Sequence, residues 1–172
     1  LNSIAALSVV DIEKMQKLLD TFSNYLRLSF DFKNASPLVP LEHELSLVRS
    51  YLYIEKERFG DRLTVKWNVE DGVNCILVPP LSIQPLVENA VKHGLLKRNR
   101  GGTVSIDIRK RGDDLQITII DDGVGMTKEQ LDQFAAGNEI RSNGIGLKNI
   151  ERRLKQRFGK GLHIQSVKEQ GT

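Results

Sequence analysis

Two carboxylates and two glycines follow one another in the sequence DDGVGM, residues 121–126, directly after the apolar run 115–120. A run rich in β-branched residues is typical of a strand, so the acidic pair is expected at a strand end. Gly123 and Gly125 permit a positive φ and let the backbone lie close to a flat ligand, because no Cβ intervenes. Asp and Gly are also the commonest residues of solvated turns, and this stretch alone favours such a turn.

A second group of polar residues lies in segment 79–95, whose apolar spacing predicts a helix. Asn89 and His93 are four positions apart with Lys92 beside them, so the three side chains can project from one helix flank. An amide oxygen suits a hard cation such as magnesium, and a lysine offers a point charge to a phosphate. The alternative is an exposed ion pair between Glu88 and Lys92, beside a surface amide and a histidine at a helix C-terminus.

A third group is the glycine pair Gly144 and Gly146, which precedes a predicted helix that starts near Leu147. Free N–H groups and the positive dipole end of a helix N-terminus form an anion site. The alternative is a flexible helix entry, since Asn-Gly is also a common turn dipeptide. Chance occurrence of all three groups in this order is much rarer than that of any one. The basic residues within 92–102 and 152–160 fit an anionic small ligand, although solvated loop charges are the default interpretation of such clusters.

The elements that must position these groups follow from the spacing of apolar residues. Helices are predicted at 12–30, 41–60, 79–95, 127–134 and 147–158, strands at 63–69, 103–111, 115–121 and 162–167, and a mobile segment at 135–143. This order argues for a helical arm followed by an α+β sandwich with helices on one face of the sheet.

The composition of the 172-residue chain, with a net charge of +3 and one cysteine, limits the classes of protein to consider. Cys75 has no partner for an intrachain disulfide, so we expect the cytoplasm. No apolar run approaches the roughly 18 residues that a membrane span needs. The basic clusters at 92–102 and 152–160 have few aromatic neighbours, so no nucleic-acid partner is expected. Because the chain opens without a methionine, we expect a piece of a longer protein.

Segments 79–94, 120–126 and 144–159 closely resemble the nucleotide-binding motifs of sensor histidine kinases of the LytS and YesM type. The resemblance continues upstream through 22–30 and 39–63 and thus covers nearly the whole chain. These kinases belong to the gyrase, Hsp90, histidine kinase and MutL superfamily. Its ATP-binding domain is a Bergerat-type two-layer α/β sandwich with a mixed sheet, which is the fold that the resemblance implies here.

The resemblance also implies a division of the chain. Residues 1–32 would be the remnant of a helical dimerisation and histidine-phosphotransfer hairpin. Residues 33–172 would form the ATP-binding catalytic domain, with 33–60 as its leading helix and a truncated final strand.

The roles of individual residues are implied in the same way. Asn89 would bind magnesium, Lys92 would contact a phosphate, and the Asp121 carboxylate would accept the adenine amino group of ATP. Glu88 is a candidate catalytic residue that would orient a metal-bound water or the incoming histidine, or would only pair with Lys92. The full set of implied ATP contacts is Asn89, Lys92, His93, Asp121, Gly123, Gly125, Met126, Gly144, Ile145, Gly146, Leu147 and Thr172.

The sequence departs from the family pattern at several positions. Asp122 stands where many relatives have Asn, which adds negative charge beside the base site. ATP hydrolases of the superfamily carry a glutamate four residues before the magnesium Asn, where this chain has Pro85, so hydrolysis is disfavoured. The phosphoacceptor histidine is expected just before Leu1. The histidines of the chain itself lack its sequence context: His43, His93 and His163.

We therefore expect the ATP- and magnesium-dependent core of a two-component sensor kinase, which transfers the γ-phosphoryl group to a histidine outside this chain. The resemblance implies a response-regulator partner, a homodimer of the full-length protein, and membrane anchoring only through upstream segments. Two alternatives stay open. One is a serine protein kinase of the anti-sigma type, although such kinases lack the helical arm, and the other is a nucleotide-binding module that transfers nothing.

Overall fold

The computed structural model describes residues 11–31, 36–98, 100–136 and 144–172. A three-stranded sheet in the order β2-β4-β5 lies at its centre. β2 runs parallel to β4, and β4 runs antiparallel to β5, so the sheet is mixed, as the resemblance implied. The strands are β2 (Leu63–Val69), β4 (Gly102–Arg111) and β5 (Asp114–Asp121), with a separate antiparallel pair of β1 (Val39–Pro40) and β3 (Leu77–Val78).

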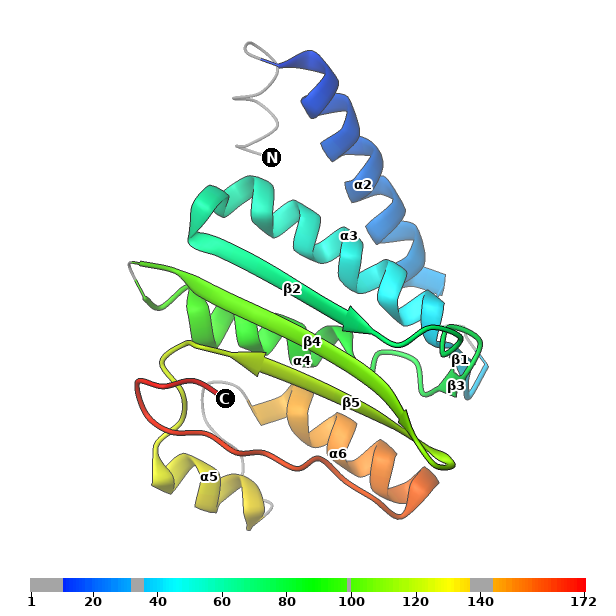
Figure 1. Cartoon of the computed structure of the whole chain (residues 1–172), viewed down its shortest axis with the longest axis vertical. Helices are drawn as coiled ribbons and strands as arrows, with labels where there is room; N and C mark the ends of the chain where they lie inside the picture. Colours follow the sequence, from blue (N-terminus) through cyan, green and yellow to red (C-terminus); the bar gives the residue numbers. More distant parts are fainter. Residues whose placement is uncertain (1–10, 32–35, 99, 137–143) are drawn as a thin grey trace.

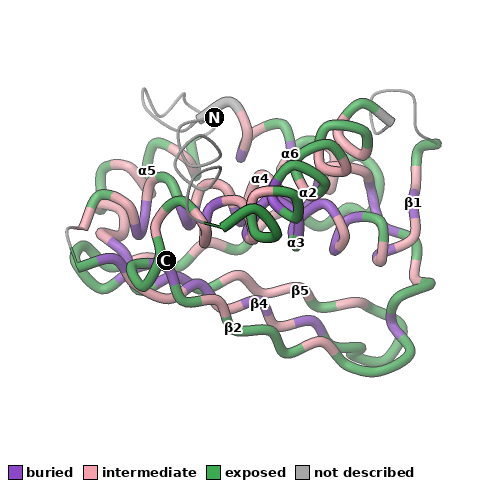
Figure 2. The backbone as a smooth tube through the Cα atoms, turned by 90° about the horizontal axis from the view of Figure 1, so that it is seen from above, coloured by how far each residue is buried: buried purple, intermediate pink, exposed green. Residues whose placement is uncertain are grey.

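Helices cover one face of this sheet, and the other face is open in the described residues (Figure 1 and Figure 2). α2 forms an arm that lies beside α3 rather than on the sheet (Figure 1). The predicted α+β sandwich with helices on one face is therefore confirmed. The helical elements are α2 (Ile12–Asp31), α3 (Leu41–Phe59), η1 (Gly60–Arg62), α4 (Gln84–Asn89), η2 (Ala90–Leu95), α5 (Lys128–Ala135) and α6 (Gly144–Phe158).

The core lies between the sheet and the helices α3, α4 and η2. Alternation along β4 turns Val104, Ile106 and Ile108 toward the helices, where each is at most 1% exposed. Leu45 and Val48 of α3 are fully buried in the same cluster. Burying one such aliphatic side chain stabilises the fold by roughly 1.5–3 kcal/mol. This packing fixes the helices to the sheet and thereby places the end of β5 next to α4 and η2.

Two predicted helices have different bounds in the structure. The segment predicted as one helix at 79–95 is a loop up to Ile83, then α4, and then the π-helical η2. Leu81 has a φ of 55°, which is outside the right-handed helical region, and Pro85 falls at the start of α4, where its missing N–H is tolerated. The helix predicted from Leu147 begins at Gly144 instead, so its glycines lie inside the first turn.

The strand predicted at 162–167 is absent from the described residues. This segment is extended beside β5 in Figure 1, but its only ladder contact is an isolated bridge between Val167 and Gly171. Its alternating pattern reflects burial on one side, which an extended segment satisfies without strand pairing. Side chains supply part of its hydrogen bonding, since Glu151 accepts the N–H of Leu162.

Two predictions concern residues that the structure does not describe. The boundary between the arm and the ATP-binding domain at residues 32 and 33 falls in such a gap and stays a prediction. Most of the segment predicted to be mobile, residues 137–143, also lies outside the described residues. Among the helices that are described, none is long and apolar enough to cross a membrane.

Candidate functional site

Asp121 ends β5, and only 5% of it is exposed. Its Oδ1 accepts the backbone N–H of Gly123 at 2.9 Å. Burial raises the pKa of the Asp121 carboxyl to about 6, although the hydrogen bond from Gly123 opposes the rise. The backbone N–H of Thr172 also lowers the pKa of this carboxyl, but no hydrogen bond to Oδ2 occurs among the described residues, and Oδ2 is not among their fully enclosed unpaired atoms. The strand end therefore presents a buried acceptor that a ligand N–H can use.

Two glycines pack against this carboxylate. A Cβ on Gly94, in η2, would collide with the Asp121 carboxylate, and a Cβ on Gly123 would collide with the backbone of Gly94. The N–H of Val124 donates to the carbonyl oxygen of Gly94 at 3.2 Å, so η2 and the end of β5 are in direct contact. The sequence predicted Gly123 as a site residue and missed Gly94. A glycine inside a helical pattern, directly after His93, was the available signal of a close approach.

The end of the chain completes this side of the site. The N–H of Asp121 donates to the carbonyl oxygen of Thr172 at 2.8 Å, and the N–H of Thr172 donates back at 3.1 Å. Gly125 has a φ of 63°, and a Cβ there would also meet the backbone of this terminal segment. The N–H of Met126 donates to Ser166 Oγ at 2.8 Å. The structure thus brings the predicted residues Thr172, Gly125 and Met126 to the end of β5.

Arg98, which sequence reasoning missed, joins the loops around this strand end. Its guanidinium donates to the carbonyl oxygens of Asp122, at 2.6 Å, and of Glu169. The Asp122 carboxylate accepts the N–H of Thr103 at 2.7 Å, so it is tied to the start of β4. Arg98 belongs to the basic cluster 92–102, which was the available signal in the sequence. Such a cluster is equally typical of a solvated loop, so it did not single out Arg98.

Asn89 ends α4 and faces the first turn of α6. A Cβ on Gly146 would lie 4.0 Å from Asn89 Nδ2, which is the nearest atom of another element among the described residues. The predicted metal ligand and the second glycine of the predicted pair, Gly146, are therefore neighbours. Leu147 is 4% exposed, so its side chain belongs to the packing and only its backbone can reach a ligand. Gly144 begins α6, and nothing is described of the side chain of Ile145.

Lys92 and Glu88 form the ion pair that the sequence offered as the alternative, with Lys92 Nζ 3.1 Å from Glu88 Oε2. The Lys92 ammonium also lies 5.7 Å from the centre of the Tyr51 ring. A half-exposed pair of this kind is held by a fraction of a kcal/mol, so Lys92 is free in energetic terms to turn to an anion. Burial, with Lys97 and Lys92 nearby, lowers the pKa of His93 and favours the neutral imidazole.

Glu88 is also linked to the arm. Tyr25 of α2 donates its hydroxyl to Glu88 Oε1 at 3.4 Å and accepts a hydrogen bond from Gln84 Nε2 at 3.0 Å. Gln84 Nε2 in turn donates to Glu88 Oε1. The side chain of the candidate catalytic residue is therefore held by two residues besides Lys92, one of them in the helical arm.

The arrangement fits a purine nucleotide with a magnesium ion. The buried Asp121 carboxylate has an oxygen that accepts no hydrogen bond among the described residues, and the glycines beside it let η2 and the end of β5 pack closely around this carboxylate. No group of three or more His, Cys, Asp or Glu residues in the described part of the chain could hold a metal by itself. A magnesium ion near Asn89 would therefore need oxygens from the ligand, which is how nucleotide-bound magnesium is usually held.

Family comparison agrees with this geometry. The family described as histidine kinase-, DNA gyrase B-, and HSP90-like ATPase matches residues 81–172, and the histidine kinase family matches residues 1–63. YwpD of Bacillus subtilis is 44% identical over 100% of this chain and 61% of its own length. The sensor histidine kinase YpdA of Escherichia coli is 36% identical over 100% of this chain and 30% of its own length. The chain thus spans from under a third to about three fifths of these relatives.

A solved structure supports the fold independently. The histidine kinase domain of a blue-light activated histidine kinase from Erythrobacter litoralis superposes with a TM-score of 0.58. The match covers 97% of this chain and 82% of that domain at 19% sequence identity. At this identity the likeness concerns the fold alone.

Proposed function

We propose that this chain, which belongs to the histidine kinase-, DNA gyrase B- and HSP90-like ATPase family, is the ATP-binding catalytic core of a sensor histidine kinase. Its described residues would form the magnesium- and ATP-binding site for phosphorylation of a histidine outside the chain. The observation that carries this proposal is the buried Asp121 carboxylate, with its unused oxygen, at the end of β5. It suits the exocyclic amino group of adenine, which donates two hydrogen bonds.

The other residues divide the work around the phosphates. Asn89 would hold magnesium through its amide oxygen, while Lys92 and the first-turn N–H groups of α6 would neutralise and orient the phosphates. Phosphoryl transfer needs mainly this positioning and charge neutralisation, and bound magnesium supplies part of the charge. A neutral histidine is already a nucleophile near pH 7, so the chain needs no strong base for it.

Glu88 has a supporting role in this proposal. Its links to Lys92, Gln84 and Tyr25 favour a residue that positions the adjacent Asn89 over one that activates water. Pro85 occupies the position at which ATP hydrolases of the superfamily carry their base. We therefore propose phosphotransfer rather than hydrolysis.

The partners follow from the same proposal. The full-length kinase would act on a response regulator and would dimerise through its helical hairpin. Partly exposed apolar side chains along α2 support the second point: Ile12, Leu19, Phe22 and Leu26. Membrane attachment would come only from segments outside this chain.

The test is the heat of binding of a non-hydrolysable ATP analogue with magnesium to the chain, to Asp121→Asn and to Asp114→Asn. In Asp121→Asn the amide NH₂ would replace Oδ2 and face the adenine NH₂, because Oδ1 is committed to Gly123. Asp114 lies at the other, exposed end of β5 and is the matched control. Loss of binding only in Asp121→Asn supports the proposal, whereas no binding by the parent chain contradicts it.

A further inference from the structure

Side chains from two helices, α3 and α6, hold the loop that precedes α4. On one side Glu44 of α3, which is fully buried, accepts the backbone N–H groups of Leu81, Ser82 and Ile83 at 2.5, 3.0 and 2.9 Å. A carboxylate is costly to bury without such donors, and these N–H groups sit at the positive end of α4. The carboxylate therefore serves as a cap that comes from another helix.

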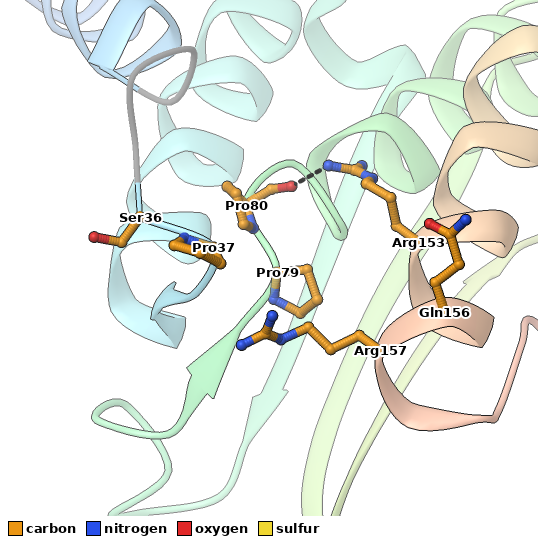
Figure 3. A pocket seen from close by; sticks show the side chains of 7 residues that line it. All are labelled: Ser36, Pro37, Pro79, Pro80, Arg153, Gln156 and Arg157. Atoms are coloured by element: carbon orange, nitrogen blue, oxygen red, sulfur yellow. Dashed lines mark hydrogen bonds between the residues drawn. The ribbon is translucent and has the colours of Figure 1, made fainter.

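On the other side, Arg153 of α6 donates to the carbonyl oxygens of Pro80 and Leu81 at 2.6 and 2.7 Å. Figure 3 shows this guanidinium reaching the loop across a cavity of about 370 Å³ that Pro79 and Arg157 also line. Leu81 is held at a φ of 55°, a conformation that costs a non-glycine residue roughly 1–3 kcal/mol. A strained loop needs surrounding contacts to hold it in place. The side chains of Glu44 and Arg153 provide such contacts through their hydrogen bonds to the loop backbone.

The same two helices meet again at the nucleotide site. Arg153 follows Gly146 in α6 by seven positions, or about two turns, so both lie on one face of that helix. Gly146 faces Asn89 at the far end of the six-residue helix α4. α6 therefore contacts the segment 80–89 at two points, one at each end. Two points fix both the separation and the orientation of α6 relative to Asn89.

We infer that Arg153 and Glu44 are positioning residues for the magnesium and phosphate part of the nucleotide site. They hold the start of α4 against α3 and α6, so that Asn89 and the first turn of α6 stay at the spacing that a magnesium triphosphate bridges. The inference rests on the proposed function. It does not extend to the adenine part, because Asp121 and Thr172 are joined by their own backbone hydrogen bonds.

The test compares Arg153→Ala with Arg152→Ala, an exposed neighbour that removes the same charge from α6. The measured quantity is the gain in affinity for a non-hydrolysable ATP analogue when magnesium is added, with adenosine affinity as the internal reference. Arg153→Ala is expected to lose at least about tenfold of the magnesium-dependent gain, since misplacement by about 1 Å has effects of this size or larger. Adenosine affinity should be unchanged, and Arg152→Ala should behave like the parent.

Conservative variants separate an effect on positioning from simple unfolding of the domain. Arg153→Lys keeps the charge but cannot donate two parallel hydrogen bonds, so its loss should be intermediate. Glu44→Gln keeps the shape but turns an NH₂ toward N–H donors, so its magnesium-dependent gain should also fall. Equal behaviour of Arg153→Ala and Arg152→Ala overturns the inference, as does a parallel loss of adenosine and magnesium-dependent binding in Arg153→Lys. Failure of the parent chain to bind the analogue would instead overturn the proposed function.

Discussion

The two sides of the proposed site are built by different means. The base side, which consists of Asp121, Gly94, Gly123 and Thr172, is closed by backbone hydrogen bonds and by glycine contacts. Its parts lie at the ends of the elements that carry them, and Arg98 is the long side chain that joins the loops around them. We expect this side to be preformed.

The phosphate side, which consists of Asn89, Lys92 and Gly146, depends on long side chains from distant elements. Glu44 and Arg153 hold the start of α4, and Tyr25 connects the arm to the residue before Asn89. A side held in this way can respond to movement of those elements. The contrast teaches that one domain can keep its base recognition fixed while its phosphate geometry stays open to control by the arm.

The strongest way to break the base side is Gly94→Ala. The new methyl group would collide with the Asp121 carboxylate, and overpacking of this kind destabilises a fold by about 1–3 kcal/mol. Because the displaced carboxylate can no longer accept the base, nucleotide affinity should fall at least about 100-fold. Calorimetry of nucleotide binding and urea denaturation measure the two effects.

The control is Gly146→Ala on the phosphate side. Among the described residues, the nearest atom of another element to a methyl group there is Asn89 Nδ2, at 4.0 Å, and alanine favours a helix over glycine by up to about 1 kcal/mol. Stability should therefore hold or rise, while magnesium-dependent binding weakens. Parent-like binding by Gly94→Ala would show that Asp121 does not read the base.

The charge of Asp121 gives the second prediction. Its pKa of about 6 in the fold lies above its ordinary value of 3.8, so its stabilising contribution is complete below about pH 3.8 and is lost as the pH rises through 6. The total is about 3 kcal/mol at 1.36 kcal/mol per pKa unit. Asp121→Asn should remove this part of the pH dependence, as urea denaturation between pH 4 and pH 8 would show.

Nucleotide affinity should change in the opposite direction. The ionised carboxylate is the better acceptor for the adenine amino group, so affinity should fall when the pH drops through 6. A parent chain whose stability does not differ from that of Asp121→Asn in its pH dependence would contradict the burial of this charge.

Sequence reasoning reached the base side more fully than the phosphate side, and the reason is physical. The end of β5 is a local pattern in which a β-branched run meets a turn, so Asp121, Gly123 and Gly125 could be predicted as a unit. The start of α5 is equally local, because Thr127 and Gln130 form a capping box four residues long.

The missed features depend on contacts between distant residues. Nothing near Glu44 or Arg153 in the sequence indicates that each binds the loop before α4, 37 or more positions away. The π-helical turns after Asn89 and the lack of strand pairing at 162–167 have no local sequence signal either. Alternation and helical spacing report which side is buried, but they do not report which backbone group a side chain will meet.

The link between the arm and the phosphate side can be sharpened with Tyr25→Phe. The change removes the hydroxyl that bridges Glu88 and Gln84. Burial and the neighbouring Glu88 raise the pKa of this Tyr25 hydroxyl to about 12, so it is protonated and can donate. Loss of one such hydrogen bond should lower the free energy of unfolding by about 0.5–1.5 kcal/mol. Magnesium-dependent affinity should fall about two- to fivefold with adenosine affinity unchanged, and Tyr53→Phe on α3 serves as control. An equal loss of adenosine affinity would show that the arm affects the whole domain and not the phosphate side alone.

The smallest expected effect on stability comes from Lys92→Gln, which separates the two interpretations of this residue. If Lys92 only pairs with Glu88, its removal costs about 0.3–0.5 kcal/mol of stability and leaves binding unchanged. If Lys92 turns to a phosphate, affinity for the triphosphate should fall several-fold, more at low salt than at high salt, while adenosine affinity stays the same. Exposed Lys97→Gln, in the turn after η2, controls for the general loss of positive charge. A salt-dependent loss confined to the triphosphate would assign Lys92 to the phosphate side. Loss of the ion pair with Glu88 alone would not weaken triphosphate binding more than adenosine binding.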